Sequence, residues 1–106
     1  MNAFGITDNG IKRLLSRTKV LSHFAITYCH GISDATAATI GNCLGRNLRT
    51  LTLSNCSGIS ATGLINLVSK CSQLQVLDIS HCAALPADAL VRIRRSLPGC
   101  VVKCDH

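Results

Sequence analysis

Aromatic side chains are scarce in this sequence of 106 residues. They make up 3% of it, with no tryptophan and one tyrosine, Tyr28. Proteins usually hold single-stranded nucleic acid by stacking its bases on aromatic rings, so the composition argues against that mode of binding. Tryptophan, tyrosine and arginine also supply most interface hot spots, so the chain offers a partner few large anchors.

Long apolar runs and targeting segments are also missing. No run approaches the ~20 residues that span a bilayer. Residues 1–8 lack the basic head, apolar run and cleavage site of a secretory signal. The glycines recur where turns are expected and form no phosphate-binding loop, so no cofactor is expected. We expect an intracellular protein of a reducing compartment, in the cytoplasm or cytoskeleton first and mitochondria second.

Charge is sparse and one-sided. Charged residues are 15% of the chain and hydrophobic residues 47%, a balance that fits a well-buried repeat array and argues against disorder. Eleven lysines and arginines against five acidic residues leave a net charge of +6. A positive surface favours an acidic partner, but the sign alone does not choose between protein, RNA and lipid headgroups.

One stretch of nine residues recurs along the chain. Residues 21–29, 48–56 and 74–82 share the pattern L-x-x-L-x-L-x-x-C, with phenylalanine for the second leucine in the first copy and isoleucine for the third in the first and last copies. A period in the twenties with one short alternating run per period is typical of a stacked solenoid. The cysteines that mark the period are Cys29, Cys56 and Cys82.

A helical pattern precedes or follows each of these stretches. Thr7 in Gly5-Ile6-Thr7-Asp8 is a predicted N-cap, Asp8 suits the positive end of the helix, and Gly31-Ile32-Ser33-Asp34 repeats the arrangement. Pro86 takes the place of the capping hydroxyl before the last helix. The predicted buried faces are Ile11, Leu14 and Leu15; Ala37, Ile40 and Leu44; Leu64, Leu67 and Val68; and Leu90, Ile93 and Leu97.

These patterns predict one domain, residues 1–106, with units of about 5–30, 31–57, 58–83 and 84–106. The last unit diverges, because its cysteine position falls on Asp105. Since the chain begins on a helix, the strand that starts at Leu21 is predicted to be the first of the sheet. Its edge is open unless residues 1–4 or another chain cover it.

The pattern L-x-x-L-x-L-x-x-C, followed by Gly-Ile-Ser or Gly-Ile-Thr, resembles the cysteine-containing class of leucine-rich repeats, best known from F-box proteins. The resemblance implies an α/β solenoid, a short horseshoe arc with parallel β-strands on the concave face and helices on the convex face. It implies protein recognition or scaffolding and no catalysis, with the cysteine serving the turn after each strand. The F-box itself has no counterpart here, because the repeats begin at residue 5.

Alternation along the strands separates two faces. Leu74, Leu77 and Ile79 are predicted to face the helices, and the residues between them form the concave face, which either binds a partner or is simply solvated. Its predicted rows are His23, Thr50, Val76 and Gly99; Ala25, Thr52, Asp78 and Val101; and Thr27, Ser54, Ser80 and Lys103.

The arginines form a second candidate surface. If functional, it would dock an acidic protein or RNA; otherwise it is a solvated helix face. Its members are Arg46, Arg49, Arg92, Arg94 and Arg95.

The seven cysteines do not predict disulfides or metal binding. The number is odd, three recur at one repeat position, and buried reduced thiols explain them. Cys100-x-x-x-Cys104-x-His106 has zinc-ligand residue types but no second knuckle, so no metal is expected. No cysteine or histidine pair has the third orienting group that nucleophilic catalysis needs.

The sequence thus predicts a non-catalytic protein-interaction module, a structural or scaffold subunit of a larger assembly such as an axonemal or mitochondrial complex. The alternative is the substrate-recognition part of an F-box-type ubiquitin ligase. The third reading is a basic RNA-associated subunit, which depends on charge alone.

Overall fold

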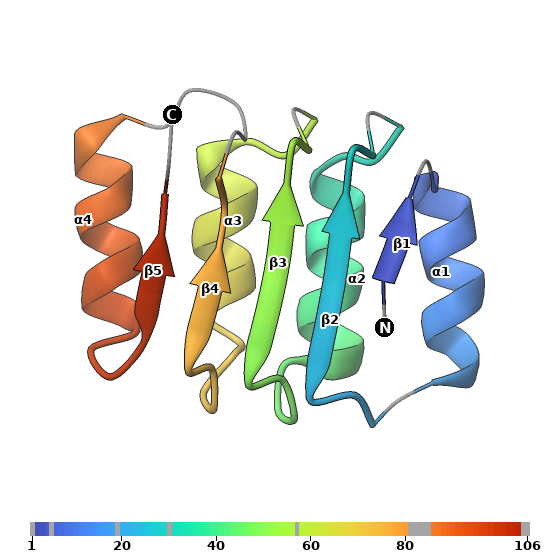
Figure 1. Ribbon diagram of the computed structural model, residues 1–106, viewed down its shortest axis with the longest axis horizontal. Helices are drawn as coiled ribbons and strands as arrows, with labels where there is room; N and C mark the ends of the chain where they lie inside the picture. Colours follow the sequence, from blue (N-terminus) through green and yellow to red (C-terminus); the bar gives the residue numbers. More distant parts are fainter. Residues whose placement is uncertain are drawn as a thin grey trace.

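The computed structural model describes residues 2–4, 6–18, 20–29, 31–56, 58–80 and 86–104, with side chains from residue 6 onward. Within them, five strands form one parallel sheet in chain order, and the helices cover one of its faces (Figure 1). The α/β architecture with a parallel sheet is as predicted and is compatible with a leucine-rich-repeat fold. The elements are β1 (Asn2–Phe4), α1 (Asp8–Arg17), β2 (His23–Thr27), α2 (Asp34–Leu44), β3 (Thr50–Ser54), α3 (Ala61–Val68), β4 (Val76–Asp78), α4 (Ala87–Ser96) and β5 (Val101–Lys103).

The first strand lies earlier than the sequence predicted. β1 pairs in parallel with β2, with Asn2 opposite Ala25 and Phe4 opposite Thr27. The prediction that the strand after Leu21 comes first is therefore wrong, although residues 1–4 were named as a segment that could cover its edge. Three residues are too few to show a strand period, which is why the sequence did not reveal β1.

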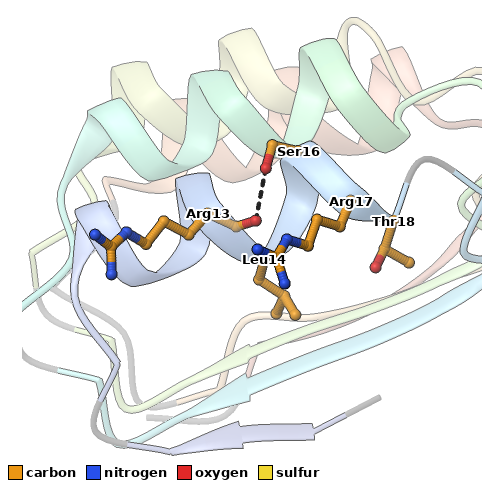
Figure 2. A pocket seen from close by; sticks show the side chains of 5 residues that line it. All are labelled: Arg13, Leu14, Ser16, Arg17 and Thr18. Atoms are coloured by element: carbon orange, nitrogen blue, oxygen red, sulfur yellow. Dashed lines mark hydrogen bonds between the residues drawn. The ribbon is translucent and has the colours of Figure 1, made fainter.

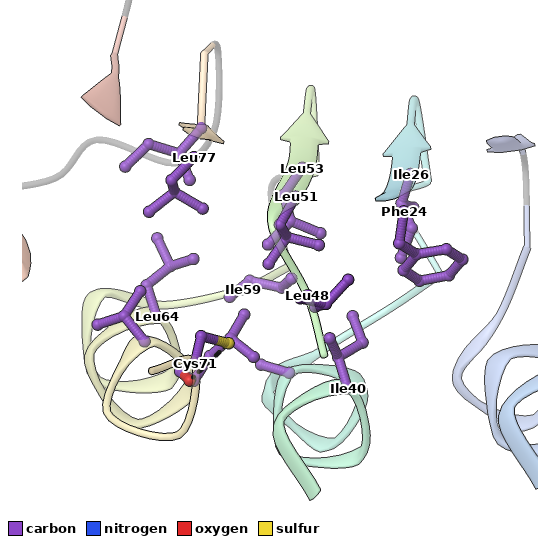
Figure 3. Close-up of a cluster of buried hydrophobic side chains, with 14 of the residues drawn as sticks. Phe24, Ile26, Ile40, Leu48, Leu51, Leu53, Ile59, Leu64, Cys71 and Leu77 are labelled. Atoms are coloured by element: carbon purple, nitrogen blue, oxygen red, sulfur yellow. Dashed lines mark hydrogen bonds between the residues drawn. The ribbon is translucent and has the colours of Figure 1, made fainter. Parts of the chain in front are cut away.

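The core lies between the sheet and the helices. Side chains that alternate along the strands point toward the helices, as Figure 3 shows for Phe24, Leu51 and Leu77, and all three are buried. The predicted inward positions Leu74 and Ile79 are buried as well. Strands pack on the next strand and helices on the next helix, so each unit shares its core with its neighbours.

The helices bury nearly the faces that the sequence predicts. All the predicted positions are buried except Leu14 and Leu90, which are partly buried against the same core. Ala89, which was not predicted, is also buried. Leu97 is the C-cap residue of α4, just beyond the last helical residue, and its side chain is buried in the core.

Hydroxyl groups cap the first three helices. The predicted N-cap Thr7 accepts a hydrogen bond from Gly10 N–H at 3.3 Å, and Ser33 and Ser60 occupy the same position in α2 and α3. Each cap satisfies an amide that the helix itself leaves without a partner. Pro86 precedes α4 without a side-chain cap, as its lack of a hydroxyl requires.

The caps of successive units are also joined to one another. The carboxylate of Asp8 accepts from Ser33 N–H at 2.9 Å, from Ser33 Oγ at 2.8 Å and from Thr36 Oγ1. Asp34 accepts in the same way from Ser60 N–H at 2.8 Å and Ser60 Oγ at 2.6 Å. We call these two steps the cap ladder.

The cap ladder does not continue from the third unit to the fourth, because both the aspartate and the capping serine are replaced there. Ala61 replaces the aspartate in the third unit, and the fourth helix follows Pro86, which has neither an N–H nor a hydroxyl to donate. The recurring aspartate therefore joins units, in addition to its favourable place at the helix N-terminus.

Asp8→Asn is expected to lower the free energy of unfolding by about 1–2 kcal/mol at neutral pH, because an amide cannot accept all the hydrogen bonds that Ser33 and Thr36 donate. Burial raises the pKa of Asp8, but the bonds from Thr36 and Ser33 outweigh it and place this pKa below its ordinary value of 3.8. The stabilisation is thus present above pH 3.8 and is lost as the pH falls through the lower folded-state pKa.

Urea unfolding of parent and variant across this pH range measures the difference. Asp88→Asn is the matched control, because Asp88 is exposed in the first turn of α4, outside the cap ladder. It should cost no more than about 0.5 kcal/mol. Equal losses in the two variants would contradict a role for the cap ladder in stability.

Candidate interaction surfaces

The open face of the sheet carries rows of side chains in register. His23, Thr50 and Val76 lie opposite one another in the first row, and Ala25, Thr52 and Asp78 do so in the second. Thr27 and Ser54 lie opposite each other and begin the third row. Ser80 follows β4, and its carbonyl accepts a hydrogen bond from Asn55 N–H at 3.1 Å. The row residues of β2, β3 and β4 were predicted to share one face, and the register brings them together; Ser80 lies beyond the paired part of β4.

The last strand is displaced from the predicted rows. Val101 lies opposite Val76 and Lys103 opposite Asp78, so each is one row earlier than predicted and Gly99 is outside the strand. The reason is the turn before β5, where Cys100 N–H bonds the Leu97 carbonyl at 3.0 Å and the strand starts only after Cys100. Because the displacement is two residues, Val101 and Lys103 keep the predicted face.

The strand face is built from small, half-buried side chains. Among the described side chains of β2 to β5, the large exposed groups of this face are those of His23, Val101 and Lys103. Asp78 is held by Ser80 N–H, which donates to Oδ1 at 3.0 Å. A surface of this kind lets the backbone of a partner approach closely, so shape would contribute more than large anchors.

The repeat cysteines lie where the chain leaves the strands. Cys29 and Cys56 are buried; Cys29 Sγ bonds the Thr27 carbonyl, and Cys56 Sγ the Ser54 carbonyl, each at 3.3 Å. The residue before each cysteine has a left-handed backbone, with φ of 53° at Tyr28 and 57° at Asn55. The thiols thus serve the carbonyls of a sharp turn; Cys82 lies outside the described residues.

The predicted arginine surface divides into two groups. Arg46 and Arg49 line one hollow together with Val20, Ser22, Asn47 and Gln73. The arginines at 92, 94 and 95 are exposed on α4, and none of them lines this hollow. The first group lies in the connection between α2 and β3, which is held by backbone hydrogen bonds.

The chain is similar in sequence to F-box/LRR-repeat proteins. The chain is 36% identical over 110 residues to F-box/LRR-repeat protein 4 of Bos taurus, which covers 85% of this chain and 17% of that protein. It is 33% identical over 77 residues to F-box/LRR-repeat protein 12 of Arabidopsis thaliana, covering 73% of this chain and 19% of that protein. The chain belongs to the leucine-rich-repeat family.

The leucine-rich-repeat chain spans less than a fifth of the length of either relative. No family model matches it. Among the described helices, none has both the length and the apolar character needed to cross a membrane.

A further hollow of the leucine-rich-repeat chain runs along α1, the helix at one end of the row. Its lining residues are Arg13, Leu14, Ser16, Arg17 and Thr18 (Figure 2). Ser16 Oγ donates to the Arg13 carbonyl at 2.7 Å, so this hydroxyl serves the helix itself. The hollow is the flank on which a preceding helix would pack if the row continued.

Two further thiols, those of Cys71 and Cys100, are poorly suited to nucleophilic chemistry. Burial and the neighbouring Cys100 raise the pKa of Cys71 to about 11, and burial also raises the pKa of Cys100. A thiol is a nucleophile only as the thiolate, and the raised pKa values keep both groups mostly protonated at neutral pH. Within the described residues no three histidine, cysteine or aspartate side chains gather as metal ligands, and His106 lies outside that part of the chain.

Proposed function

We propose that this chain is a protein–protein interaction module, a short leucine-rich-repeat solenoid that acts by contact and not by catalysis. In this proposal the strand face receives the partner, and the module is a structural subunit of a larger assembly. The cap ladder and the shared core support this role, because they hold the strands in a fixed arrangement on which a partner can rely.

The observation that carries the proposal is the register of the strand face. Three polar or small positions of β2 are continued by β3 in the same rows, and β4 continues two of them. Such a face matches an extended segment or a helix that lies across the strands. A preformed surface also costs a partner less free energy of ordering than a mobile one.

A second candidate function is favoured by the comparisons. Both relatives are F-box/LRR-repeat proteins, so the chain is a candidate for the substrate-recognition part of an F-box-type ubiquitin ligase. In that case the same strand face would hold the substrate. The two functions differ in the other proteins that accompany the chain.

A pair of matched variants tests the proposal. Thr52→Arg places a long cationic side chain in the middle of the strand face, whereas Thr62→Arg makes the same change at an exposed position of α3. We expect Thr52→Arg to lose at least about tenfold in affinity for the natural partner. Thr62→Arg should bind like the parent.

Tagged parent and variants would be used to recover partners from an extract of the source organism, followed by mass spectrometry and affinity measurement on the purified partner. A defined complex that lacks a Skp-type adaptor supports the subunit role, and recovery of that adaptor supports the ligase role. If both variants keep full affinity while melting like the parent, the strand face is not the binding surface.

A further inference from the structure

The described aspartates and most of the described basic residues of this fold lie at different edges. The strands are parallel and each helix runs back against them, so strand starts and helix ends share one edge, which we call the strand-entry edge (Figure 1). The described acidic residues, all aspartates, lie at helix starts or at the end of a strand, away from this edge. They are Asp8, Asp34, Asp78 and Asp88.

Six of the ten described basic residues lie at the strand-entry edge, whereas Lys103 ends β5 at the opposite edge, in register with Asp78. These six follow or end helices, or they precede strands. They are Arg17, Arg46, Arg49, Lys70, Arg94 and Arg95. With no aspartate of the described residues at this edge, its positive potential is uncompensated.

The helix dipole explains only some of these positions. Arg17, Arg94 and Arg95 are in the last turns of their helices, where a cation is favoured. α2 and α3 have no basic residue in their last turn. Arg46 and Arg49 stand beyond α2, in its connection to β3, and require another account.

These two arginines line a hollow whose backbone is held in place. Arg49 N–H donates to the Ser22 carbonyl at 2.8 Å, and the Arg49 carbonyl accepts from Gln75 N–H at 2.7 Å. Asn47 N–H bonds the Leu44 carbonyl at 2.9 Å. The loops of three units are thus fixed to one another, and the hollow exists before any partner arrives.

The guanidinium groups in this hollow make no ion pair or hydrogen bond with the part of the chain that the structure describes, and both residues are exposed. The amides of Asn47 and Gln73 line the same hollow, and Val20 adds an apolar side chain that is 79% exposed. Free guanidinium groups, amides and one aliphatic group together form a site for a chain that carries carboxylates and an apolar residue.

We infer that the hollow lined by Val20, Arg46 and Arg49 docks an acidic segment of a partner protein. Glutamate or aspartate carboxylates would pair with the arginines, the amides of Asn47 and Gln73 would bond the backbone of the segment, and an aliphatic side chain would cover Val20. An acidic protein segment is favoured over RNA because no aromatic ring is among the described residues that line the hollow. Tyr28 follows β2 at the opposite edge. This surface lies outside the strand face and does not depend on its function.

Fluorescence anisotropy with a short labelled peptide rich in glutamate and leucine tests the inference. Arg46→Glu combined with Arg49→Glu should weaken binding at least about tenfold, because attraction becomes repulsion at the docking site. Arg13→Glu combined with Arg92→Glu changes the net charge equally at exposed helix positions and should weaken binding by less than about threefold. Arg46→Gln combined with Arg49→Gln should give an intermediate loss.

Four further measurements, the last with a polyuridine oligonucleotide, separate the outcomes. The same peptide with glutamine for glutamate should not bind, and Thr52→Arg should bind the acidic peptide like the parent, which keeps this test independent of the strand face. Circular dichroism melting checks that each variant is folded. Equal losses in the two Glu double variants, no binding of the acidic peptide, or tighter binding of a polyuridine oligonucleotide would each overturn the inference.

Discussion

Leu77→Ala is expected to lower the free energy of unfolding by about 2–5 kcal/mol. Leu77 is fully buried at the centre of β4, and its backbone lies in register with Leu51 and Val102. Because it points into the core that successive units share (Figure 3), removing its side chain leaves a cavity between units rather than at an edge.

Chemical unfolding in urea, followed by circular dichroism, measures this change. Val76→Ala is the matched control: Val76 is the neighbouring residue of β4, points to the strand face and is only half-buried. We expect it to cost less than about 1.5 kcal/mol. If Leu77→Ala melted like the parent, the assignment of faces along β4 would be wrong.

Gly58→Ala is expected to destabilise the protein by about 1–3 kcal/mol or more. A Cβ atom at this position would lie 2.0 Å from the carbonyl oxygen of Ile32, in the preceding unit. A backbone oxygen cannot rotate away as the end of a side chain can, so the two units would have to separate. The glycine is needed for this close approach.

Gly99→Ala is the control for Gly58→Ala, because a Cβ atom there would have no neighbour within 4 Å. We expect it to leave stability unchanged or to raise it by about 0.4–1 kcal/mol, since alanine restricts the unfolded chain. Thermal and urea unfolding of both variants would measure the difference. Equal behaviour would mean that the units can shift apart without cost.

Much of the fold was predictable because its units repeat. The alternating leucines of β3 and β4 and the spaced apolar residues of the helices recur with one period, so each copy supports the assignment of the others. Thr7 was predictable as an N-cap on local chemistry alone. Such features depend on residues close together in the chain.

The positions that the sequence did not reveal depend on pairing between distant segments. β1 is too short to show a period, and its existence is decided by the open edge of β2. The register of β5 follows from the turn at Leu97 and Cys100 in the divergent last unit. The cap ladder could have been suspected from the matching pairs Thr7-Asp8 and Ser33-Asp34, but its hydrogen bonds run between units.

Of the two candidate surfaces, one could be predicted from the sequence and the other could not. The sequence by itself determined which side chains share the strand face, because alternation along a strand needs only the local backbone. Only the tertiary structure decided that Arg46 and Arg49 meet Val20 and Gln73 in one hollow while the arginines of α4 lie elsewhere. That grouping depends on where three connections end after the units stack, and stacking is a property of contacts between units that no single repeat encodes.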